Sequence, residues 1–311
     1  MPKLLTVAIP TYNRAAELER QLAWLGRAVA GFEERCDVIL SDNASPDDTP
    51  AVCAKWNELL SSRGIGVRVN RMPTNVGPLP NIARCIEVSE SRFTWVIGDD
   101  DEIADDALAF VVARLDERPD LASLVLNFEG VGKTVYPRCF DLPADRFGPG
   151  KPIMSELLRQ AYFGLAFMTA QVYRTAFAQA ALRAWPEGPT NYDYQVFVTA
   201  YTGLQGDVLA TRDTHVKYVT GQNIYETDKR VALRLYADSL DVFVHLARVG
   251  YDPALCRALA RRHLRALGKR FVKRAMENYP LVTIETLARA ARYLAQLQTT
   301  RFMRPRPRGR G

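Results

Sequence analysis

Phe93–Glu102, with the sequence FTWVIGDDDE, is the stretch that decides the fold of this 311-residue chain. Phe93–Ile97 has strong β-propensity and leads directly into Gly98 and three consecutive aspartates, Asp99–Asp101. A short run of this kind predicts a buried strand of a parallel sheet. Because ligands of open α/β sheets bind outside the carboxyl ends of the strands, these aspartates are expected to lie in a binding site.

Three adjacent carboxylates repel one another, so a folded chain tolerates them best beside a cation. Their hard oxygen atoms suit Mg²⁺ or Mn²⁺ holding a diphosphate. The alternative is a solvated acidic turn before the next helix, in which an aspartate serves as the N-cap.

Composition and charge limit the class of protein. The chain is 48% hydrophobic, 24% charged and 10% aromatic, which is typical of a globular protein and argues against disorder except at the ends. Residues 1–200 hold 20 Lys and Arg against 26 Asp and Glu, whereas residues 201–311 hold 21 against 9. The excess of positive charge therefore belongs to the C-terminal third and predicts an acidic surface as its partner.

The cysteines are odd in number, scattered and without a Cys-x-x-Cys pair: Cys36, Cys53, Cys85, Cys139 and Cys256. This pattern favours reduced, buried thiols over a disulfide framework or a zinc site. An apparent strand follows Met1-Pro2-Lys3 directly, so no signal peptide is expected, and no run of 18 apolar residues predicts a membrane span. We expect a soluble, cytoplasmic protein.

Strand and helix signals alternate through the first 130 residues. Strands are predicted over 4–9, 37–40, 65–69, 93–98 and 121–126, and helices over 15–30, 46–60, 79–90 and 105–117. Alternation at this spacing predicts βαβ units and a parallel sheet covered by helices.

The pattern is less regular after Gly130. A long irregular connection is followed by predicted helices at 155–161, 176–184 and 192–201, and by two short strands, 208–210 and 216–219, joined by a turn. Helices are predicted over 229–249, 253–277 and 283–299, and a disordered basic tail over 301–311.

Three further polar clusters follow predicted strands, at Ala8–Arg14, Ile39–Thr49 and Asn75–Arg84. All would lie along one edge of the sheet beside the three aspartates. Folding alone does not explain four polar strand ends on one edge, because loops need only be soluble.

The segments VAIPTYNR (7–14), SDNASPDDT (41–49), NVG (75–77) and DDD (99–101) resemble, in order and spacing, the family 2 nucleotide-sugar glycosyltransferases, which have the GT-A fold. The variant IGDDDEI (97–103) is similar to bacterial abequosyltransferase-like members that build O-antigen and capsule. The resemblance covers residues 4–130 well and 160–225 loosely, and it does not extend to the C-terminal helices.

The resemblance implies a donor site at these strand ends. Residues expected to border the base and ribose are Pro10, Thr11, Tyr12, Arg14, Asp42 and Asn43. Asp42 is similar to the aspartate that accepts a hydrogen bond from a pyrimidine N–H, although an Asx-turn with Ser45 is an alternative role. The diphosphate side is expected to involve Asn75, Gly77, Asn81 and Arg84, of which Arg84 is equally compatible with an ordinary surface position.

The metal motif of the family, Asp-x-Asp, is matched by Asp99 and Asp101 with Asp100 between them. The resemblance implies that one acid contacts the ribose and the last contacts the metal, so Asp101 is the strongest candidate ligand for Mg²⁺ or Mn²⁺. His215 is a further candidate near the metal or diphosphate, and a partly buried, hydrogen-bonded structural histidine is the alternative.

A glycosyltransferase also needs a base for the acceptor hydroxyl. In the segment where the family places this acid, Asp193 is the better match and Glu187 the reserve, although Tyr192 stands where the family usually has a second acid. The alternative for Asp193 is compensation of the helix dipole in the first turn. Gly164–Thr169 resembles the floor of the acceptor site, though its apolar residues are also compatible with core.

The predicted helix 253–277 carries a basic ridge, Arg257, Arg261, Arg265, Lys269 and Lys273, opposite the apolar side chains of Leu255, Leu259, Leu264, Leu267 and Phe271. Residues 257–274 hold eight basic residues and no acid. Like charges four residues apart destabilise a helix, and an anionic membrane surface would compensate them. Nucleic acid is a weaker match because aromatic residues are sparse, and a solvated helix face is the alternative to both.

Taken together, we expect an α/β fold of the GT-A type: a Rossmann-like mixed sheet flanked by helices, followed by a C-terminal helical region. The expected divisions are a catalytic domain, 1–225, with a donor half, 1–130, and an acceptor half, 131–225; a helical region, 226–300; and the tail, 301–311.

The expected activity is metal-dependent transfer of a sugar from a nucleotide diphosphate to a glycan or lipid-linked acceptor, in surface polysaccharide biosynthesis at the inner face of the bacterial cytoplasmic membrane. Direct displacement with inversion is expected, and a retaining outcome, found among related members of the fold, is the alternative. The alternatives are a haloacid-dehalogenase-like phosphatase, whose motif lacks its threonine here, and a non-catalytic sugar-nucleotide-binding protein of degenerate GT-A fold.

Overall fold

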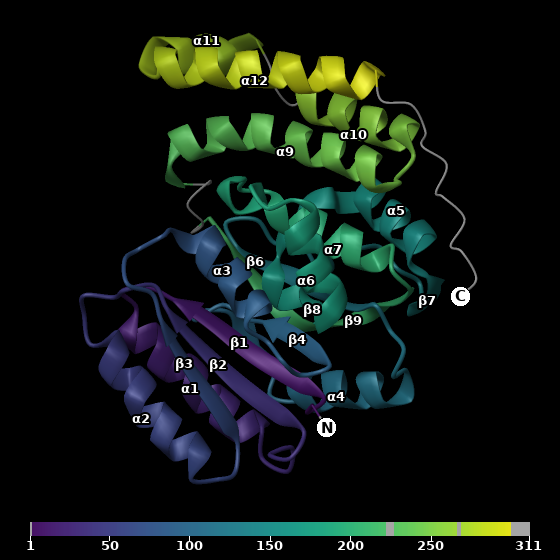
Figure 1. The fold of residues 1–311 in the computed structure, drawn as a ribbon. Coiled ribbons are helices and arrows are strands. Elements are labelled where there is room, and N and C mark those ends of the chain that lie inside the picture. The colour runs from purple at the N-terminus through teal and green to yellow at the C-terminus, as the bar shows by residue number, and fades with distance from the viewer. Residues whose placement is uncertain (1, 222–226, 266–268, 300–311) are drawn as a thin grey trace.

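The computed structural model describes residues 2–221, 227–265 and 269–299 (Figure 1). Its strands are β1 Leu5–Thr11, β2 Cys36–Asp42, β3 Gly66–Arg71, β4 Phe93–Val96, β5 Glu102–Ile103, β6 Ser123–Gly132, β7 Arg146–Pro149, β8 Gln171–Arg174 and β9 Asp207–Thr220. They form one nine-stranded sheet in the order β3-β2-β1-β4-β8-β6-β9-β5, with β7 paired to β9.

The helices before residue 204 flank this sheet (Figure 1). The α-helices are α1 Ala15–Ala28, α2 Thr49–Ser61, α3 Pro78–Glu87, α4 Ala107–Glu117, α5 Gly150–Ala161, α6 Thr175–Ala184 and α7 Tyr194–Gly203. Three short 3-10 turns are η1 Tyr162–Ala166, η2 Met168–Ala170 and η3 Gly188–Thr190. Helix α1 packs on α2 and α4, whereas α3 and α7 both pack on α6.

The first four long strands form the parallel part of the sheet. Ala8 in β1 lies between Ile39 of β2 and Val96 of β4, so the three strands end at the same edge. Nearly all residues of β1, β2 and β4 are buried, because helices cover both faces of a parallel sheet. Strand β3, at the edge of the sheet, is largely exposed. The predicted βαβ arrangement of this part is confirmed.

The sheet becomes mixed at β8, a four-residue strand that the sequence analysis did not predict. It runs antiparallel to both β4 and β6 and separates them in the sheet. Strand β6 therefore points in the same direction as β4 without pairing with it. The expectation of a mixed sheet is confirmed, and the parallel sheet predicted for the first 130 residues is interrupted by β8 between β4 and β6.

Strand β9 replaces the two short strands predicted over 208–210 and 216–219. The polar middle part of β9 lies where the pairing register between β9 and β6 shifts, around Asn127. The backbone N–H of Asn127 donates to Thr211 Oγ1 at 2.9 Å, and its side chain donates to the carbonyls of Phe140 and Arg212. These hydrogen bonds satisfy backbone groups that the irregular register leaves unpaired, so the polar residues can remain within one strand.

The C-terminal helices are α9 Lys229–Val249, α10 Pro253–Arg265, α11 Lys269–Asn278 and α12 Pro280–Thr299. Helices α9 and α10 pack on α7 and α5, and α12 packs on the outer side of α9 and α10 with α11 beside it (Figure 1). The prediction for 229–249 is confirmed. Of the helix predicted over 253–277, residues 253–265 and 269–277 are helical, and residues 266–268 lie outside the described residues. Residues 301–311, the expected disordered tail, lie outside the described residues. None of the described helices is long and apolar enough to cross a membrane.

The structure describes part of the predicted basic ridge. Arg257 donates to the carbonyl oxygen of Leu297 in α12 at 3.2 Å, so it takes part in helix packing. Arg261 and Arg265 are exposed on α10, and Lys273 is exposed on α11. A continuous ridge over 257–273 stays a prediction, because residues 266–268 and the side chain of Lys269 lie outside the described part of the chain.

Candidate functional site

The loops that follow β1, β2 and β4 meet at the carboxyl edge of the parallel strands. Thr11 Oγ1 donates to Asp99 Oδ2 at 2.7 Å and so links β1 to the aspartate triplet. The backbone N–H of Asn13 donates to Ser45 Oγ at 2.9 Å and links the first two loops. The expectation that these polar strand ends share one edge is confirmed.

The three aspartates lie in different environments. Asp99 is buried, Asp101 is half-buried and Asp100 is exposed. Asp101 Oδ2 accepts hydrogen bonds from the backbone N–H of Gly98 at 3.0 Å and from the hydroxyl of Thr169. A Cβ atom at Gly98 would overlap the Asp101 carboxylate, which explains why glycine suits this position.

Charge at the triplet is only partly compensated. Burial raises the pKa of Asp99 to about 6, although Thr11 and Arg14 act in the opposite direction. Burial also raises the pKa of Asp101 to about 6, opposed by its bond from Thr169. Arg14 forms ion pairs with Asp99, at 3.4 Å, and with Asp100. Desolvated carboxylates of this kind are stabilised by a further cation.

The donor set fits Mg²⁺ or Mn²⁺, because both ions prefer carboxylate oxygen atoms and take their remaining ligands from phosphates and water. Asp99 and Asp101 are the side chains that would hold the ion. Within the described residues, no group of three or more His, Cys, Asp or Glu side chains is placed to hold a metal. Two carboxylates together with a diphosphate are a sufficient set for such an ion.

His215 lies in β9 against helix α4. Its Nδ1 is 3.4 Å from Asp106 Oδ1, and its ring stacks on Phe110 with centroids 4.0 Å apart. These contacts agree with the structural alternative for this histidine, and the proposed role of His215 near the metal stays a prediction.

Asp42 is buried at the end of β2 and forms the alternative Asx-turn. Its Oδ1 accepts from the backbone N–H of Ser45 at 2.9 Å, while Oδ2 pairs with the guanidinium of Arg71. A carboxylate has about four acceptor positions, so a contact with a donor base stays a prediction. The sequence analysis missed Arg71, although parallel pairing of β2 and β3 places it directly opposite Asp42.

Asn43 organises the start of α3. Its side chain donates to Asn75 Oδ1 at 2.9 Å and to the carbonyl of Gly77 at 3.0 Å, and it accepts from the backbone N–H of Val76. Gly77 has a φ of 89°, a left-handed conformation that glycine adopts without strain. The predicted donor residues Asn43, Asn75 and Gly77 therefore lie together beside the edge.

The other predicted donor residues are divided between core and surface. Asn81 is buried and bonds with both Ser41 Oγ and the Ser41 carbonyl, so it joins α3 to β2. Arg84 pairs with Glu87 at 2.7 Å on the surface of α3, in agreement with its alternative role. Pro10 is the half-buried penultimate residue of β1, and Tyr12, directly after that strand, is exposed.

Asp193 is buried at the start of α7, beneath helix α9. Its Oδ2 accepts a hydrogen bond from Ser239 of α9, while Oδ1 makes no hydrogen bond to the described residues. Burial raises the pKa of Asp193 to about 7, and the Ser239 hydroxyl acts in the opposite direction. Asp193 stands at the N-cap of α7, and its side chain forms no capping hydrogen bond there. Its role as the base and its alternative role, compensation of the helix dipole, both stay predictions. Glu187, the reserve candidate, is exposed at the start of η3.

A polar network connects the Asp193 loop with the C-terminal helices. Asp238 Oδ2 accepts from the backbone N–H of Tyr192 at 3.1 Å, and Asp238 Oδ1 pairs with Arg289 of α12 at 2.7 Å. The hydroxyl of Tyr162 lies 3.4 Å from Ser239 Oγ and 2.9 Å from His263 Nδ1 of α10. The sequence analysis did not identify Ser239, Asp238 and Arg289, because they lie in the C-terminal helices, to which the family resemblance does not extend.

Gly164–Thr169, the predicted acceptor-side floor, lies beneath the triplet. Phe167 packs edge-on against Phe128 and Tyr218, which agrees with the core alternative. Thr169 contacts Asp101 directly, and its carbonyl accepts from Trp95 Nε1 at 2.8 Å. The segment therefore serves both as core and as support for the aspartates.

Comparison with known sequences agrees with this geometry. Residues 6–177, more than half of the chain, match glycosyl transferase family 2. Abequosyltransferase RfbV of Salmonella typhimurium is 30% identical over 118 residues, which cover 38% of this chain and 34% of that protein. Validoxylamine A glucosyltransferase of Streptomyces hygroscopicus subsp. jinggangensis is 44% identical over 57 residues, or 18% of this chain and 13% of that protein. The matches thus span about a third or less of these relatives.

Solved structures share the fold over almost the whole chain. TarS 1–349 from S. aureus has a TM-score of 0.61 and 18% identity, with 94% of this chain and 80% of that chain covered. Its complex with UDP-GlcNAc has a TM-score of 0.62 and 16% identity, with the same coverage. Mannosyltransferase PcManGT from Pyrobaculum calidifontis, in complex with GDP-Man and Mn²⁺, has a TM-score of 0.53 and 14% identity over 96% of this chain and 88% of that chain.

At these identities the structural likeness concerns the fold alone, and it confirms the expected GT-A type architecture. The family match covers the strand ends that carry the aspartate triplet and the loops after β1 and β2. This chain belongs to glycosyl transferase family 2.

Proposed function

We propose that this protein is a glycosyltransferase that moves a sugar from a nucleotide diphosphate to a hydroxyl of a glycan or lipid-linked acceptor in surface polysaccharide biosynthesis. The observation that carries the proposal is the convergence of Thr11, Arg14 and the aspartate triplet at one sheet edge. Family membership supports the reaction type, and the match to abequosyltransferase RfbV supports the setting.

The donor half binds and orients the nucleotide. Asp42 is held by Ser45 and Arg71 at a fixed position, so a remaining lone pair can accept a base N–H. Asp99 and Asp101 would hold a divalent ion on the diphosphate. Such an ion, when bound, neutralises negative charge that develops on the leaving nucleotide. Asp99 is kept in place by Thr11, and Asp101 by Gly98 and Thr169.

Asp193 is the proposed base. As the acceptor oxygen forms a bond to the anomeric carbon, the carbon–oxygen bond to the diphosphate breaks and its electron pair leaves with the nucleotide. The acceptor proton passes to Asp193, whose pKa of about 7 suits proton transfer near neutral pH. Direct displacement of this kind inverts the configuration at the anomeric carbon.

Association with the inner face of the bacterial cytoplasmic membrane is part of this proposal. It is supported by the 21 basic against nine acidic residues in 201–311, since anionic lipids attract such a segment. A lipid-linked acceptor would be presented at the same surface.

A thermal-shift screen of nucleotide diphosphates with and without Mn²⁺ tests the donor site. A nucleotide at 100 times its dissociation constant should stabilise the protein by about 2.7 kcal/mol. The expected result is a rise in melting temperature that requires both nucleotide and Mn²⁺. No shift with any nucleotide would contradict the proposal, whereas binding without transfer to any acceptor would favour the non-catalytic alternative.

A further inference from the structure

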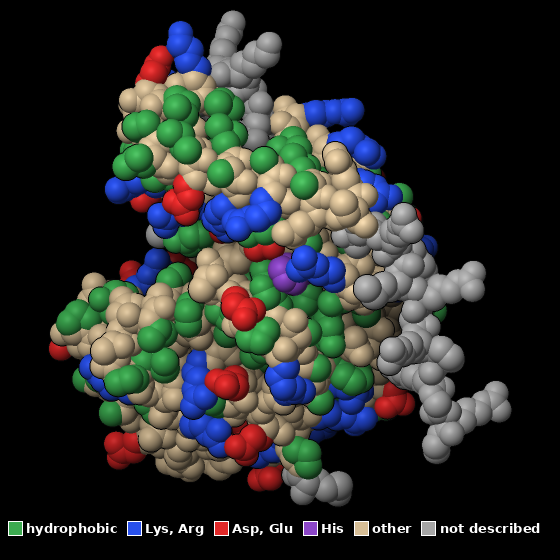
Figure 2. Space-filling model, turned by 45° about the horizontal axis from the view of Figure 1, so that its top comes forward, with side chains coloured by type: hydrophobic (Ala, Val, Ile, Leu, Met, Phe, Trp, Pro, Cys, Tyr) green, Lys and Arg blue, Asp and Glu red, His purple; other side chains and the backbone are tan. Residues whose placement is uncertain are grey.

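The corner where α11 meets α12 exposes several large apolar side chains. Met276 is 39% exposed, Leu281 81%, Ile284 54% and Leu287 41%. Leu281, Ile284 and Leu287 recur every three residues, so they share one face of α12, while Thr283 and Thr286 are buried on the other. Figure 2 shows hydrophobic side chains gathered on the C-terminal helices at the top of the view. Contiguous exposed apolar side chains of this kind mark an interaction surface.

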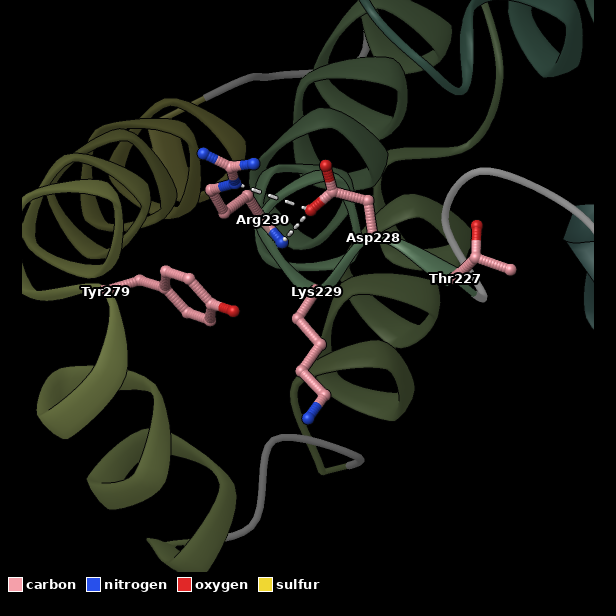
Figure 3. A pocket seen from close by; sticks show the side chains of 5 residues that line it. All are labelled: Thr227, Asp228, Lys229, Arg230 and Tyr279. Carbon is pink, nitrogen blue, oxygen red and sulfur yellow. Dashed lines mark hydrogen bonds and ion pairs between the residues drawn. The ribbon is translucent and has the colours of Figure 1, made fainter.

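Cationic side chains and a tyrosine lie beside this apolar corner. Lys229 and Arg230, at the start of α9, line an open hollow of about 630 Å³ together with Tyr279, the residue between α11 and α12 (Figure 3). Arg230 pairs with Asp228 at 3.6 Å, and Lys229 forms no ion pair with the residues described. Tyrosine beside cations and exposed apolar groups is the combination found where proteins meet the headgroup level of a bilayer.

Charge distinguishes the two kinds of partner that could cover this apolar surface, a second copy of the chain and a lipid bilayer. Residues 269–292 contain six basic residues, Lys269, Arg270, Lys273, Arg274, Arg289 and Arg292, against two acidic ones, Glu277 and Glu285. A second copy of the chain would bring the same positive charge to the contact. Arg289 is paired with Asp238 inside the fold, which leaves five basic residues against two acidic ones in this segment. An anionic lipid surface attracts this remaining positive charge and also accepts the apolar side chains into its headgroup and acyl boundary.

We propose that the α11–α12 corner is a membrane-docking surface, in which Met276, Leu281, Ile284 and Leu287 enter an anionic lipid layer and Lys229 and Arg230 contact lipid phosphates. This inference deepens the membrane association proposed above by assigning it to a different surface. The basic ridge on α10 is less suited, because Arg257 is bound to the Leu297 carbonyl.

The apolar part of the proposal is tested by vesicle co-sedimentation of the full chain, using phosphatidylcholine vesicles with and without phosphatidylglycerol. The variant Leu281→Gln with Ile284→Gln retains helix propensity and removes exposed groups. It should bind phosphatidylglycerol vesicles at least about tenfold more weakly than the wild type, since each buried apolar side chain contributes about 1.5–3 kcal/mol. Val135→Gln, at a residue 76% exposed in the catalytic half, is the matched control and should bind normally.

The cationic part is tested by Lys229→Gln with Arg230→Gln. Each basic residue near such a surface contributes about 1 kcal/mol, so the pair should weaken binding about tenfold after screening. Arg20→Gln with Arg27→Gln removes the same charge from exposed positions on α1 and should have little effect. Equal weakening by both pairs would show a general charge effect and overturn the assignment.

Two other results would overturn the assignment of the α11–α12 corner as a membrane-docking surface. Wild-type protein that does not sediment with phosphatidylglycerol vesicles has no such surface. A dimer in solution that becomes monomeric in the Leu281 and Ile284 variant identifies a second copy as the occupant. Nucleotide binding is measured in parallel: if it fails while vesicle binding persists, the donor-site proposal fails and the docking surface stands.

Discussion

Asp101 is the residue through which the donor-site proposal is most directly tested. Asp101→Asn can still accept the Gly98 N–H, whereas alanine would leave both Gly98 and Thr169 without this partner. We expect at least about a tenfold loss of Mn²⁺-dependent nucleotide affinity, since even groups outside the ligand shell typically contribute 10–100-fold. Titration calorimetry with and without Mn²⁺ measures this loss. An unchanged affinity would remove Asp101 from the metal site.

Asp193 is expected to act on turnover rather than on donor binding. Asp193→Asn keeps an acceptor for the Ser239 hydroxyl but cannot take the acceptor proton. Turnover should fall by roughly 10²–10⁴-fold with nucleotide affinity unchanged, the usual range for a general base. Initial rates and thermal shifts on the same preparation separate the two effects. Near-normal turnover would transfer the role to Glu187 or to another residue.

Ser239 is expected to set the pH range of the reaction. The active form of Asp193 is the carboxylate, so activity should rise as pH increases through about 7. The Ser239 hydrogen bond lowers this pKa, and Ser239→Ala should therefore move the rise to higher pH. Hydrogen bonds to charged groups contribute about 1.5–3 kcal/mol, which predicts a displacement on the order of one pH unit.

The matched control for this displacement is Ser155→Ala. Ser155 donates to the carbonyl of Lys151, four residues earlier. The hydroxyl of Ser239 is likewise within 3.0 Å of the carbonyl four residues earlier, that of Leu235, but its single proton is the one assigned to Asp193. Ser155 makes no hydrogen bond to a carboxylate within the described part of the chain, so the variant's profile of kcat/KM against pH should match that of the wild type. Equal displacement in both variants would show that the effect arises from helix stability rather than from Asp193.

The candidate site could be predicted from sequence only where its residues stand next to recognisable strand ends. Asp99 and Asp101 follow an apolar run, and Thr11 and Asp42 end two others. Arg71 required the parallel register of β2 with β3 in addition. Ser239 could not be found in this way, because its contact with Asp193 depends on how a helix 46 residues later packs over α7.

At the level of elements, the same distinction separates β1–β4 from β8 and β9. Strands β1, β2 and β4 could be predicted from their apolar runs, since burial on both faces requires continuous hydrophobic sequence. Strand β3, which is largely exposed, was predicted from the alternation of strands and helices around it. Strand β8 has four residues, and its position between β4 and β6 is set by pairing partners far away in the chain. Strand β9 contains polar residues that an irregular register with β6 accommodates, so its sequence pattern resembles a turn.

The α9–α12 contact contains an ion pair whose loss should be costly. The Asp238 side chain is only 3% exposed and Arg289 is 24% exposed. Arg289→Ala leaves a buried carboxylate without its partner, which typically costs about 3–5 kcal/mol in the free energy of unfolding. Urea unfolding monitored by circular dichroism measures this difference.

Arg248→Ala is the control at the same helix pair. Arg248 donates to Gln296 at 3.1 Å on the exposed side of the α9–α12 contact. Its loss should change the free energy of unfolding by no more than about 0.5 kcal/mol. Similar values for the two variants would mean that the buried pair contributes no more than a surface contact.

For the whole molecule, the arrangement of the core predicts cooperative unfolding of the sheet and the C-terminal helices. One hydrophobic cluster extends from Leu5 in β1 through Phe243 in α9 to Leu297 in α12. Tyr251, buried after α9, donates to the carbonyl of Ala200 in α7 at 2.8 Å. The C-terminal helices α9–α12 therefore share one core with the sheet and the helices that flank it.

We accordingly expect a single calorimetric transition, with equal calorimetric and van't Hoff enthalpies. At about 0.7 kcal/mol per residue, its enthalpy should be on the order of 200 kcal/mol. A nucleotide bound at the sheet edge should raise the temperature of the whole transition, because it stabilises every part that unfolds with its site. Two transitions, of which only one responds to nucleotide, would show that the helical layer unfolds independently. In that case Ser239 could separate from Asp193 while the sheet stays folded. Helix α9 would then control the proposed base by packing on α7 or leaving it.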